Sequence, residues 1–216
     1  MNKANLVFLN KFNAWVRPGT LDEYILKEVR SAYKDLEIQP TDTILDVGAN
    51  IGAFAKLAVD KGAQVYCYEP EPENFGLLEL NSPRSKNFNT AVVGEDAPPF
   101  VDLYVASTKN KGIHMLRPVN GRDSIKVGTT SFDVAVKSSL ANKIKIDAEG
   151  AEYQFMPYIF PDKVERVVME IHFQYDPTWR QKGRAVHDSM LAQGFTALKE
   201  FKDTGKNWHT IGAYAR

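Results

Sequence analysis

TILDVGANIGAFAKLAVDKGAQVYCYE, residues 43–69, is the stretch that decides the fold of this chain. A short apolar run ends in Asp46, and a turn with Gly48 and Gly52 follows it. A helix-like segment then leads to a second apolar run, which ends in Glu69. This is the order of a β-turn-α-β unit, which in a parallel sheet binds its ligand beyond the carboxyl ends of the strands. We therefore expect a ligand site at this edge.

The spacing of the glycines favours one class of ligand over another. A dinucleotide-binding turn has the pattern G-x-G-x-x-G, because three glycines let the backbone approach a pyrophosphate at a helix N-terminus. Here the run is D-V-G-A-N-I-G, and Asp46 would repel a pyrophosphate. S-adenosylmethionine fits better, because its ammonium suits an acid, its carboxylate suits backbone N–H groups and its ribose hydroxyls suit Glu69. A helix-capping turn beside two incidental acids is the alternative.

The composition is that of an ordinary globular protein. Of 216 residues, 44% are hydrophobic and 25% charged, with Lys+Arg and Asp+Glu equal at 27 each. This length suits one domain with a substantial core, and the balanced charge shows no nucleic-acid footprint. The only cysteine, Cys67, is expected in the core, and a disulfide within the chain is impossible. Without 18 consecutive apolar residues or a signal peptide pattern, we expect a cytoplasmic protein with no membrane anchor.

Upstream of the first strand, the sequence predicts an N-terminal arm followed by a helix. Thr20 and Glu23 have the spacing of a capping box at the start of this helix. An apolar stripe at helical spacing contains Leu21, Tyr24, Ile25, Val29, Tyr33 and Leu36. We expect the helix to pack against the sheet or to lie over the mouth of the ligand site.

Downstream of Glu69, strands and helices alternate, which predicts a doubly wound sheet. The expected helices cover residues 73–80, 131–140 and 180–193, and the expected strands cover residues 88–93, 143–147 and 164–172. Two closing strands, at residues 195–198 and 209–214, are typical of the antiparallel end of a seven-stranded sheet.

An insertion interrupts this alternation at residues 94–130. A strand at 101–105, a turn at 110–112 and a return strand at 113–116 predict a hairpin, and residues 117–130 are expected to form a loop.

Basic side chains predominate in the later part of the insertion. They are Lys109, Lys111, Arg117, Arg122 and Lys126. A basic loop near the ligand edge could attract an anionic acceptor. The alternative is a solvated insertion whose charges have no partner.

Three motifs taken together resemble the FkbM-type methyltransferases. They are DVGANIG at residues 46–52, YEP at 68–70 and KIDAEGAE at 145–152, flanked by TSFD at 130–133 and EIH at 170–172. The resemblance implies a class I, Rossmann-like three-layer αβα sandwich whose mostly parallel seven-stranded sheet has an antiparallel last strand. It also implies O-methylation, dependent on S-adenosylmethionine, of a hydroxyl on a sugar, glycan or polyketide-like small molecule. Residues 1–216 would then be a single domain.

The same resemblance implies the roles of particular residues. Its cofactor-binding positions are Asp46, Gly48, Asn50, Gly52, Glu69 and Asp147. Its acidic motif beside the methyl group contains Asp147, Glu149 and Glu152.

The catalytic candidates are Asp147, Glu149 and His172, because all three fall at strand ends on the ligand edge. Methyl transfer needs an acceptor oxygen held in line with the methyl carbon, and a base helps an alcohol to lose its proton. His172 is the most natural proton acceptor, since a histidine titrates near neutral pH, and a structural role in its strand is the alternative. The same three side chains could hold Mg²⁺ or Mn²⁺. We favour a metal-free route and predict no metal ligand.

Other classes of function fit the sequence less well. A nucleic-acid amino methyltransferase would have N-P-P-Y or D-P-P-Y where this chain has Asp147-Ala148-Glu149-Gly150. An NAD-dependent oxidoreductase would need the third glycine of its fingerprint. A non-catalytic nucleotide-binding protein or scaffold of the same fold stays open. The expected partner is a small-molecule or glycan acceptor, with an anionic one as an option, and neither a membrane nor a nucleic acid is expected.

Overall fold

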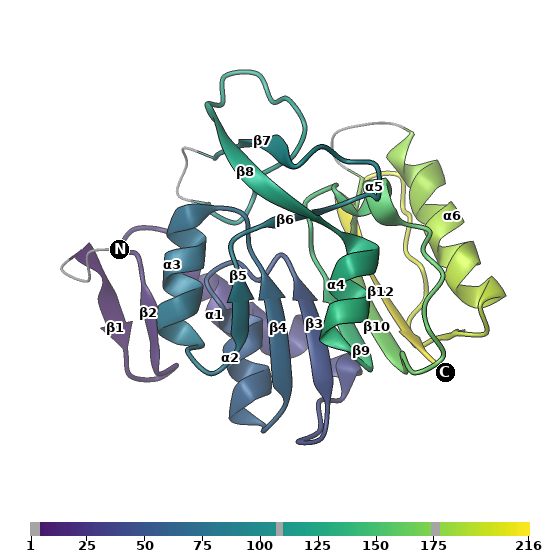
Figure 1. The fold of residues 1–216 in the computed structure, drawn as a ribbon, viewed down its shortest axis with the longest axis horizontal. Helices are drawn as coiled ribbons and strands as arrows, with labels where there is room; N and C mark the ends of the chain where they lie inside the picture. The colour runs from purple at the N-terminus through teal and green to yellow at the C-terminus, as the bar shows by residue number, and fades with distance from the viewer. Residues whose placement is uncertain (1–4, 107–109, 174–177) are drawn as a thin grey trace.

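The centre of the fold is a seven-stranded sheet. A computed structural model describes residues 5–106, 110–173 and 178–216 (Figure 1). The strand order is β11-β12-β10-β9-β3-β4-β5. The parallel strands are β3 (Thr43–Val47), β4 (Gln64–Tyr68), β5 (Lys86–Phe88), β9 (Lys143–Ile146) and β10 (Arg166–His172). The last strand, β12 (His209–Ala215), is antiparallel to both β10 and β11 (Thr196–Ala197), which confirms the predicted sheet.

Helices cover both faces of this sheet, because successive strand residues point to opposite sides. Ile44 packs in one cluster with α1 (Asp22–Ala32), α2 (Ala53–Asp60) and α3 (Pro72–Asn81). Its neighbour Leu45 packs in another cluster with α4 (Phe132–Ser139) and α6 (Trp179–Ala192). The predicted three-layer αβα sandwich is confirmed. The predicted core position of Cys67 is confirmed as well, since its side chain is buried in the first cluster.

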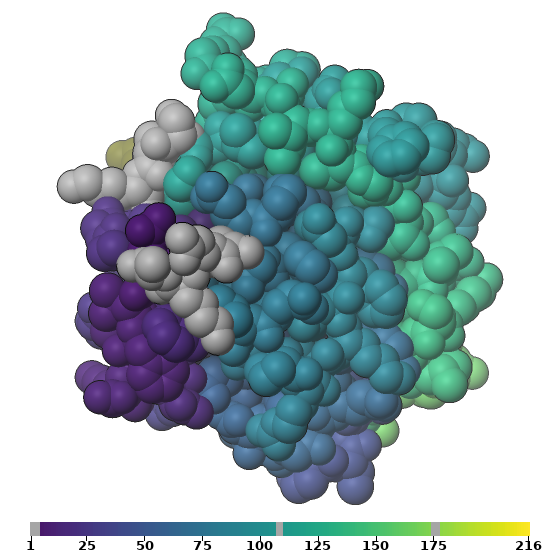
Figure 2. All heavy atoms as spheres, turned by 60° about the vertical axis from the view of Figure 1, so that its left-hand side comes forward, coloured from purple at the N-terminus to yellow at the C-terminus, as the bar shows by residue number. Residues whose placement is uncertain are grey.

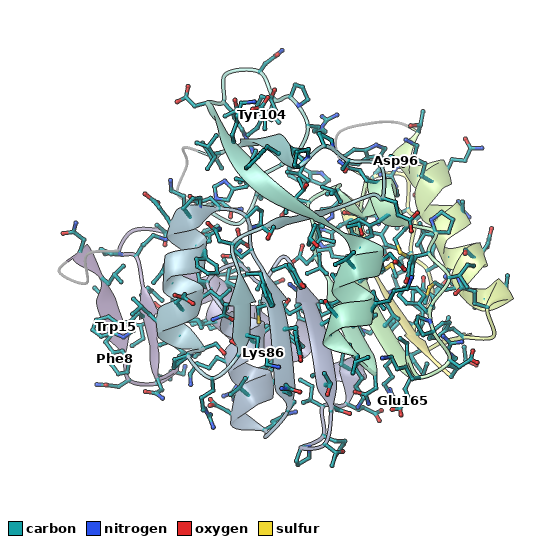
Figure 3. The ribbon with its side chains drawn as sticks, in the orientation of Figure 1. Phe8, Trp15, Lys86, Asp96, Tyr104 and Glu165 are labelled. Atoms are coloured by element: carbon teal, nitrogen blue, oxygen red, sulfur yellow. The ribbon has the colours of Figure 1, made fainter. Side chains whose placement is uncertain are left out.

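A second, three-stranded sheet lies over the carboxyl ends of β3, β4 and β5 (Figure 1). Its strands are β6 (Ala91–Val93), β7 (Phe100–Tyr104) and β8 (Ser124–Ser131), in the order β6-β8-β7. Tyr104 lies in this upper sheet (Figure 3). The strand predicted at residues 88–93 is therefore wrong as one element, because its two halves belong to different sheets.

The inserted hairpin is present, but its predicted return strand is wrong. Residues 113–116 contribute a single bridge between Met115 and Tyr104, whereas β8 pairs with the whole of β7. The β8 segment was expected to be loop. The β8 segment pairs with β7 because the side chain of Val127 packs in a small apolar cluster with Leu103. Residues 113–116 cannot form a long ladder, because Pro118 follows shortly after them and a proline cannot donate a ladder hydrogen bond.

The predicted N-terminal arm contains a short hairpin, β1 (Val7–Leu9) and β2 (Ala14–Val16). Phe8 and Trp15 lie together on it, with ring centroids 5.1 Å apart (Figure 3). Figure 2 shows this flank, with the hairpin in purple and the second sheet in teal above the body. Asn81 of α3 fixes the hairpin by accepting from the Trp15 N–H at 2.6 Å and donating to its carbonyl at 3.0 Å.

The capping box predicted for α1 is wrong. Leu21 occupies the N-cap position without a side-chain hydrogen bond, and Glu23 pairs with Lys27 at 2.6 Å. The Thr20 hydroxyl donates to the Arg17 carbonyl instead. The buried carboxylate of Asp22, held by Arg17 at 2.9 Å, fixes the start of the helix.

Helix α1 packs against the sheet, one of the two positions expected for it, and it also borders a cavity. Val29 is buried against the sheet, together with Leu26, which the predicted stripe did not include. Leu21 and Tyr24 are exposed and line the mouth of a cavity. None of the helices in the described ranges is long and apolar enough to cross a membrane.

Candidate functional site

Two adjoining cavities open at the carboxyl edge of the central sheet, where the sequence predicted a ligand site. The outer cavity, of about 360 Å³, lies between α1 and the ends of β9, β10 and β12. The inner cavity, of about 60 Å³, lies between the glycine turn and the second sheet. The residues that line both cavities are Gly48, Asn50, Gly112, Asp147 and Glu149.

The glycine turn brings two strand ends into close contact. Gly48 has a φ of 75°, and a Cβ atom there would lie 1.8 Å from the Asp147 carbonyl oxygen. Asn50 also has a left-handed conformation, with a φ of 52°, and its side-chain oxygen accepts from the Ile51 N–H at 2.7 Å. Gly52 begins α2 with a φ of 81° and lines neither cavity. Gly48 and Asn50 thus shape the cavities directly, whereas Gly52 supports them through α2.

Glu69 lies at the end of β4 and lines the inner cavity, as a ribose-binding acid would. Its carboxylate is buried and accepts from the Asn50 N–H at 2.8 Å and the Glu71 N–H at 2.9 Å. Burial raises the pKa of Glu69 to about 7, although the two N–H groups lower it. Since each carboxylate oxygen has two acceptor positions, both oxygens can still accept from a pair of hydroxyls.

Asp46 does not face either cavity. Its carboxylate is fully buried, and its Oδ1 lies 3.0 Å from the Lys145 ammonium. Lys145 also donates to the Gly48 carbonyl at 2.6 Å. Asp46 is therefore placed to support the glycine turn through Lys145, rather than to contact a ligand's ammonium as the sequence suggested.

His172 lies among carboxylates from three different elements. Its side chain is 2% exposed, and its Nδ1 lies 3.1 Å from Glu152 Oε1. Its Nε2 faces Glu149 Oε2 at 3.5 Å, Glu170 Oε1 at 3.6 Å and Asp147 Oδ1 at 4.0 Å. The predicted catalytic trio is thus brought together, with Glu152 and Glu170 added to it.

These carboxylates change the protonation of the histidine. Burial lowers the pKa of His172, but Glu152, Glu149 and Glu170 outweigh burial and raise that pKa well above its ordinary value. These charges favour the protonated form of the ring. The prediction of His172 as proton acceptor depended on an ordinary histidine pKa and stays a prediction, while the raised pKa favours a second candidate for this role.

Glu149 has the properties that a proton acceptor needs. Burial raises its pKa to about 7, with Asp147 adding to the effect and His172 opposing it. Its Oε2 is buried and has no hydrogen-bond partner in the described part of the chain. Its backbone is in the left-handed region, with a φ of 49°, a conformation that costs energy for a residue other than glycine. A carboxylate with a free oxygen and a pKa near neutrality suits general-base catalysis.

Several residues of the site were not assigned from the sequence. The Tyr33 hydroxyl donates to Asp147 Oδ2 at 3.0 Å, although the sequence placed Tyr33 only in an apolar stripe. Glu170 lines the outer cavity, and burial followed by the charge of Asp147 raises its pKa to about 8. Lys145 could have been found from its place in a buried strand, since a buried lysine needs an acidic partner such as Asp46.

The basic insertion does not line the cavities with arginine. Arg122 donates to the Ile113 carbonyl at 2.5 Å, and the Arg117 guanidinium lies 5.3 Å from the ring centroid of Trp179. Among the described lining residues of both cavities, the only lysine or arginine is Lys145. Lys109 lies outside the described residues. An anionic acceptor held by these side chains stays a prediction.

Comparison with known proteins agrees with this arrangement. The sequence model of the methyltransferase FkbM domain matches residues 46–197. The hexuronic acid methyltransferase AglP of Haloferax volcanii is 26% identical over 178 residues, which are 77% of this chain and 70% of that protein.

A solved structure shows the same fold. A Pyrococcus horikoshii protein classed as a transferase has a TM-score of 0.51 at 16% identity, covering 97% of this chain and 70% of that one. Pyrococcus horikoshii TYW2, in complex with MeSAdo, has a TM-score of 0.49 at 16% identity, with the same coverage of 97% and 70%. The matched region begins at Asp46 and includes His172. The chain therefore belongs to the FkbM family of methyltransferases, as its motifs predicted.

Proposed function

We propose that the protein transfers the methyl group of S-adenosylmethionine to a hydroxyl oxygen of a sugar or glycan. One observation carries the proposal: a buried acid suited to a ribose, Glu69, and a carboxylate with a free oxygen, Glu149, both line the edge where two cavities meet. The family and the relative that acts on a hexuronic acid support it.

The inner cavity has the side chains that the cofactor needs. Glu69 would accept from the ribose hydroxyls, and the apolar Val92 and Leu103 would contact the base. When bound, S-adenosylmethionine supplies an electrophilic methyl group on a sulfonium. The cavity of about 60 Å³ is smaller than the roughly 300 Å³ or more of most ligand pockets. Binding of the cofactor therefore requires the lining of this cavity to move outward.

The outer cavity suits a hydroxylated acceptor. Its volume of about 360 Å³ is in the range of small-molecule sites. Tyr24 at the mouth offers an aromatic face, and the acids at the base of the cavity, including Asp147 and Glu170, can accept from several hydroxyls. Glu149 Oε2 would take the proton of the reacting hydroxyl, and the electron pair of that O–H bond would stay on the acceptor oxygen.

A methyl-transfer assay tests the proposal. The protein is incubated with S-adenosylmethionine carrying a radioactive methyl group and with matched pairs of neutral and acidic sugars, such as glucosides and glucuronides. We expect label in an alkali-stable methyl ether. Label in an alkali-labile ester or on an amine, or no transfer by a protein that binds S-adenosylhomocysteine, would overturn the proposal.

Replacing Glu69 with Ala should weaken S-adenosylhomocysteine binding by about 1.5–3 kcal/mol, the range for hydrogen bonds to a charged group. This corresponds to a Kd about 10- to 150-fold higher. Isothermal titration calorimetry measures the change, and Glu73→Ala, which removes an exposed acid of α3, is the control with unchanged affinity. Unchanged affinity in a folded Glu69→Ala variant would remove Glu69 from the cofactor site.

The affinity for S-adenosylhomocysteine should depend on pH. Because burial raises the pKa of Glu69 to about 7, the carboxyl is mostly protonated at pH 5.5 and mostly ionised at pH 8.5. The ionised carboxylate accepts from both ribose hydroxyls, so the affinity for S-adenosylhomocysteine should rise with pH. Below the pKa of Glu69 the rise should be up to about tenfold per pH unit. Calorimetry across this range measures it, and Glu69→Ala should lose that part of the dependence. An equal slope in both proteins would contradict this expectation.

A further inference from the structure

We propose that Asp147, Glu170 and His172 bind one divalent cation, of the class of Mg²⁺ or Mn²⁺, at the base of the outer cavity. Each residue offers one ligand atom, and the three atoms lie within 4.8 Å of one another. Cation binding does not depend on the proposed function, whereas a role of the cation in catalysis does. The sequence favoured a metal-free site, and the spatial grouping of these three donors changes that preference.

The orientation of His172 is the first independent sign of a metal site. Its Nδ1 is held by Glu152 Oε1 at 3.1 Å, and the same oxygen accepts from the His172 N–H at 2.9 Å. Glu152 is buried and lines neither cavity. The nearly fully buried ring thus directs Nε2 to the outer cavity, without a hydrogen bond from Nε2 to any described residue. A carboxylate on the far nitrogen is the usual support of a metal-ligating histidine.

The two carboxylate donors are also held from outside the trio. Asp147 Oδ2 accepts from the Tyr33 hydroxyl at 3.0 Å, which leaves Oδ1 as the oxygen nearest His172 Nε2, at 4.0 Å. Glu170 Oε1 lies 3.3 Å from His209 Nδ1 and 3.6 Å from His172 Nε2. Two oxygens and one imidazole nitrogen, with room for water or acceptor oxygens, suit a hard ion such as Mn²⁺.

The charge around the trio supports a cation. Four carboxylates, those of Asp147, Glu149, Glu152 and Glu170, lie around His172, while the nearby Lys145 is paired with Asp46. Partly buried negative charge of this kind is unfavourable without a counter-charge. Protons are the other possible counter-charge, and an ion that displaced them would release them to solvent.

A cation would also explain how an acid-lined cavity could receive an acidic sugar. Glu28, Asp147, Glu149 and Glu170 all line the outer cavity and would repel a carboxylate. An ion on the trio would place positive charge where such a substrate has its acid or hydroxyl oxygens. Glu149 is outside the trio and keeps its role as proton acceptor.

Manganese binding to the full chain, without cofactor, tests the proposal. Free Mn²⁺ is followed by electron paramagnetic resonance, and proton release is measured by calorimetry in buffers of different ionisation enthalpy. We expect one bound ion per chain with release of protons. Glu170→Gln should weaken binding at least tenfold, and Glu152→Gln by about 10–100-fold. Glu28→Gln removes an acid from the same cavity outside the trio and should change affinity less than threefold.

The outcomes separate a specific site from general attraction and from the proposed function. No Mn²⁺ binding at millimolar concentration, or equal weakening by Glu28→Gln and Glu170→Gln, would overturn the site. Asp147→Asn replaces Glu170→Gln if thermal melting shows that the latter is unfolded. If Mn²⁺ binds as expected but no sugar is methylated, the proposed function fails and the site stands. If methyl transfer survives EDTA and Mn²⁺ does not bind, the cation site is wrong and the proposed function stands.

Discussion

Replacing Glu149 with Gln is expected to lower kcat for methyl transfer by about 10²–10⁴-fold, the usual contribution of a general base. The amide keeps the size of the side chain but cannot accept the proton of the acceptor hydroxyl. Glu149 Oε2 has no hydrogen-bond partner among the described residues, so the change breaks no hydrogen bond there, although it removes one of the charges that raise the pKa of His172. The affinity for S-adenosylhomocysteine should change little.

Single-turnover rates and their pH profile measure this effect. Because burial raises the pKa of Glu149 to about 7, the wild-type rate should rise with pH and level off above about 8, while the variant should lose this rise. Glu79→Gln, which replaces an exposed acid of α3, is the control with an unchanged rate. A Glu149→Gln variant that keeps the wild-type rate and profile would show that another group takes the proton.

Replacing Lys145 with Met is expected to lower the free energy of unfolding by about 3–5 kcal/mol, the cost of breaking a buried ion pair by removing one partner. Asp46 is fully buried, and the Lys145 ammonium, 3.0 Å away, is its only described counter-charge at ion-pair distance. The variant would also remove the donor to the Gly48 carbonyl. Both losses fall on the glycine turn, so cofactor affinity should weaken as well.

Urea unfolding with matched variants separates the pair from a general effect of losing a lysine. Lys27 pairs with Glu23, both side chains are 52% exposed, and Lys27→Met should cost less than about 1 kcal/mol. The double variant Lys145→Met/Asp46→Leu should recover much of the lost stability, because it leaves no unpaired charge. Equal destabilisation by Lys145→Met and Lys27→Met would contradict the role of the buried pair.

The central sheet could be predicted from the sequence, because its strands are clear apolar runs. Residues 43–69 combine two apolar runs with a glycine turn, and these became β3, α2 and β4. The pairing in the insertion was harder to predict from the sequence, because residues 113–116 and residues 124–131 both contain apolar residues. Which of them pairs with β7 depends on the cluster around Leu103, formed by segments distant in the chain.

The positions of the site residues could be predicted, whereas their protonation could not. Glu69, Asp147 and Glu149 follow the ends of strands, so their place at one edge follows from the order of the elements. The state of His172 depends on Glu152, twenty residues away, and Asp147 is held by Tyr33, 114 residues away. Such contacts exist only in the folded chain, so the sequence alone could not give the direction in which the pKa of His172 shifts.

A crystal structure of the complex with S-adenosylhomocysteine tests the central claim most directly. We expect the ribose hydroxyls on the Glu69 carboxylate, the adenine between the glycine turn and the second sheet, and the sulfur near Glu149. We also expect the inner cavity to be wider in the complex than its present volume of about 60 Å³. A ligand whose adenosine fills the outer cavity beside Tyr24, away from Glu69, would contradict it.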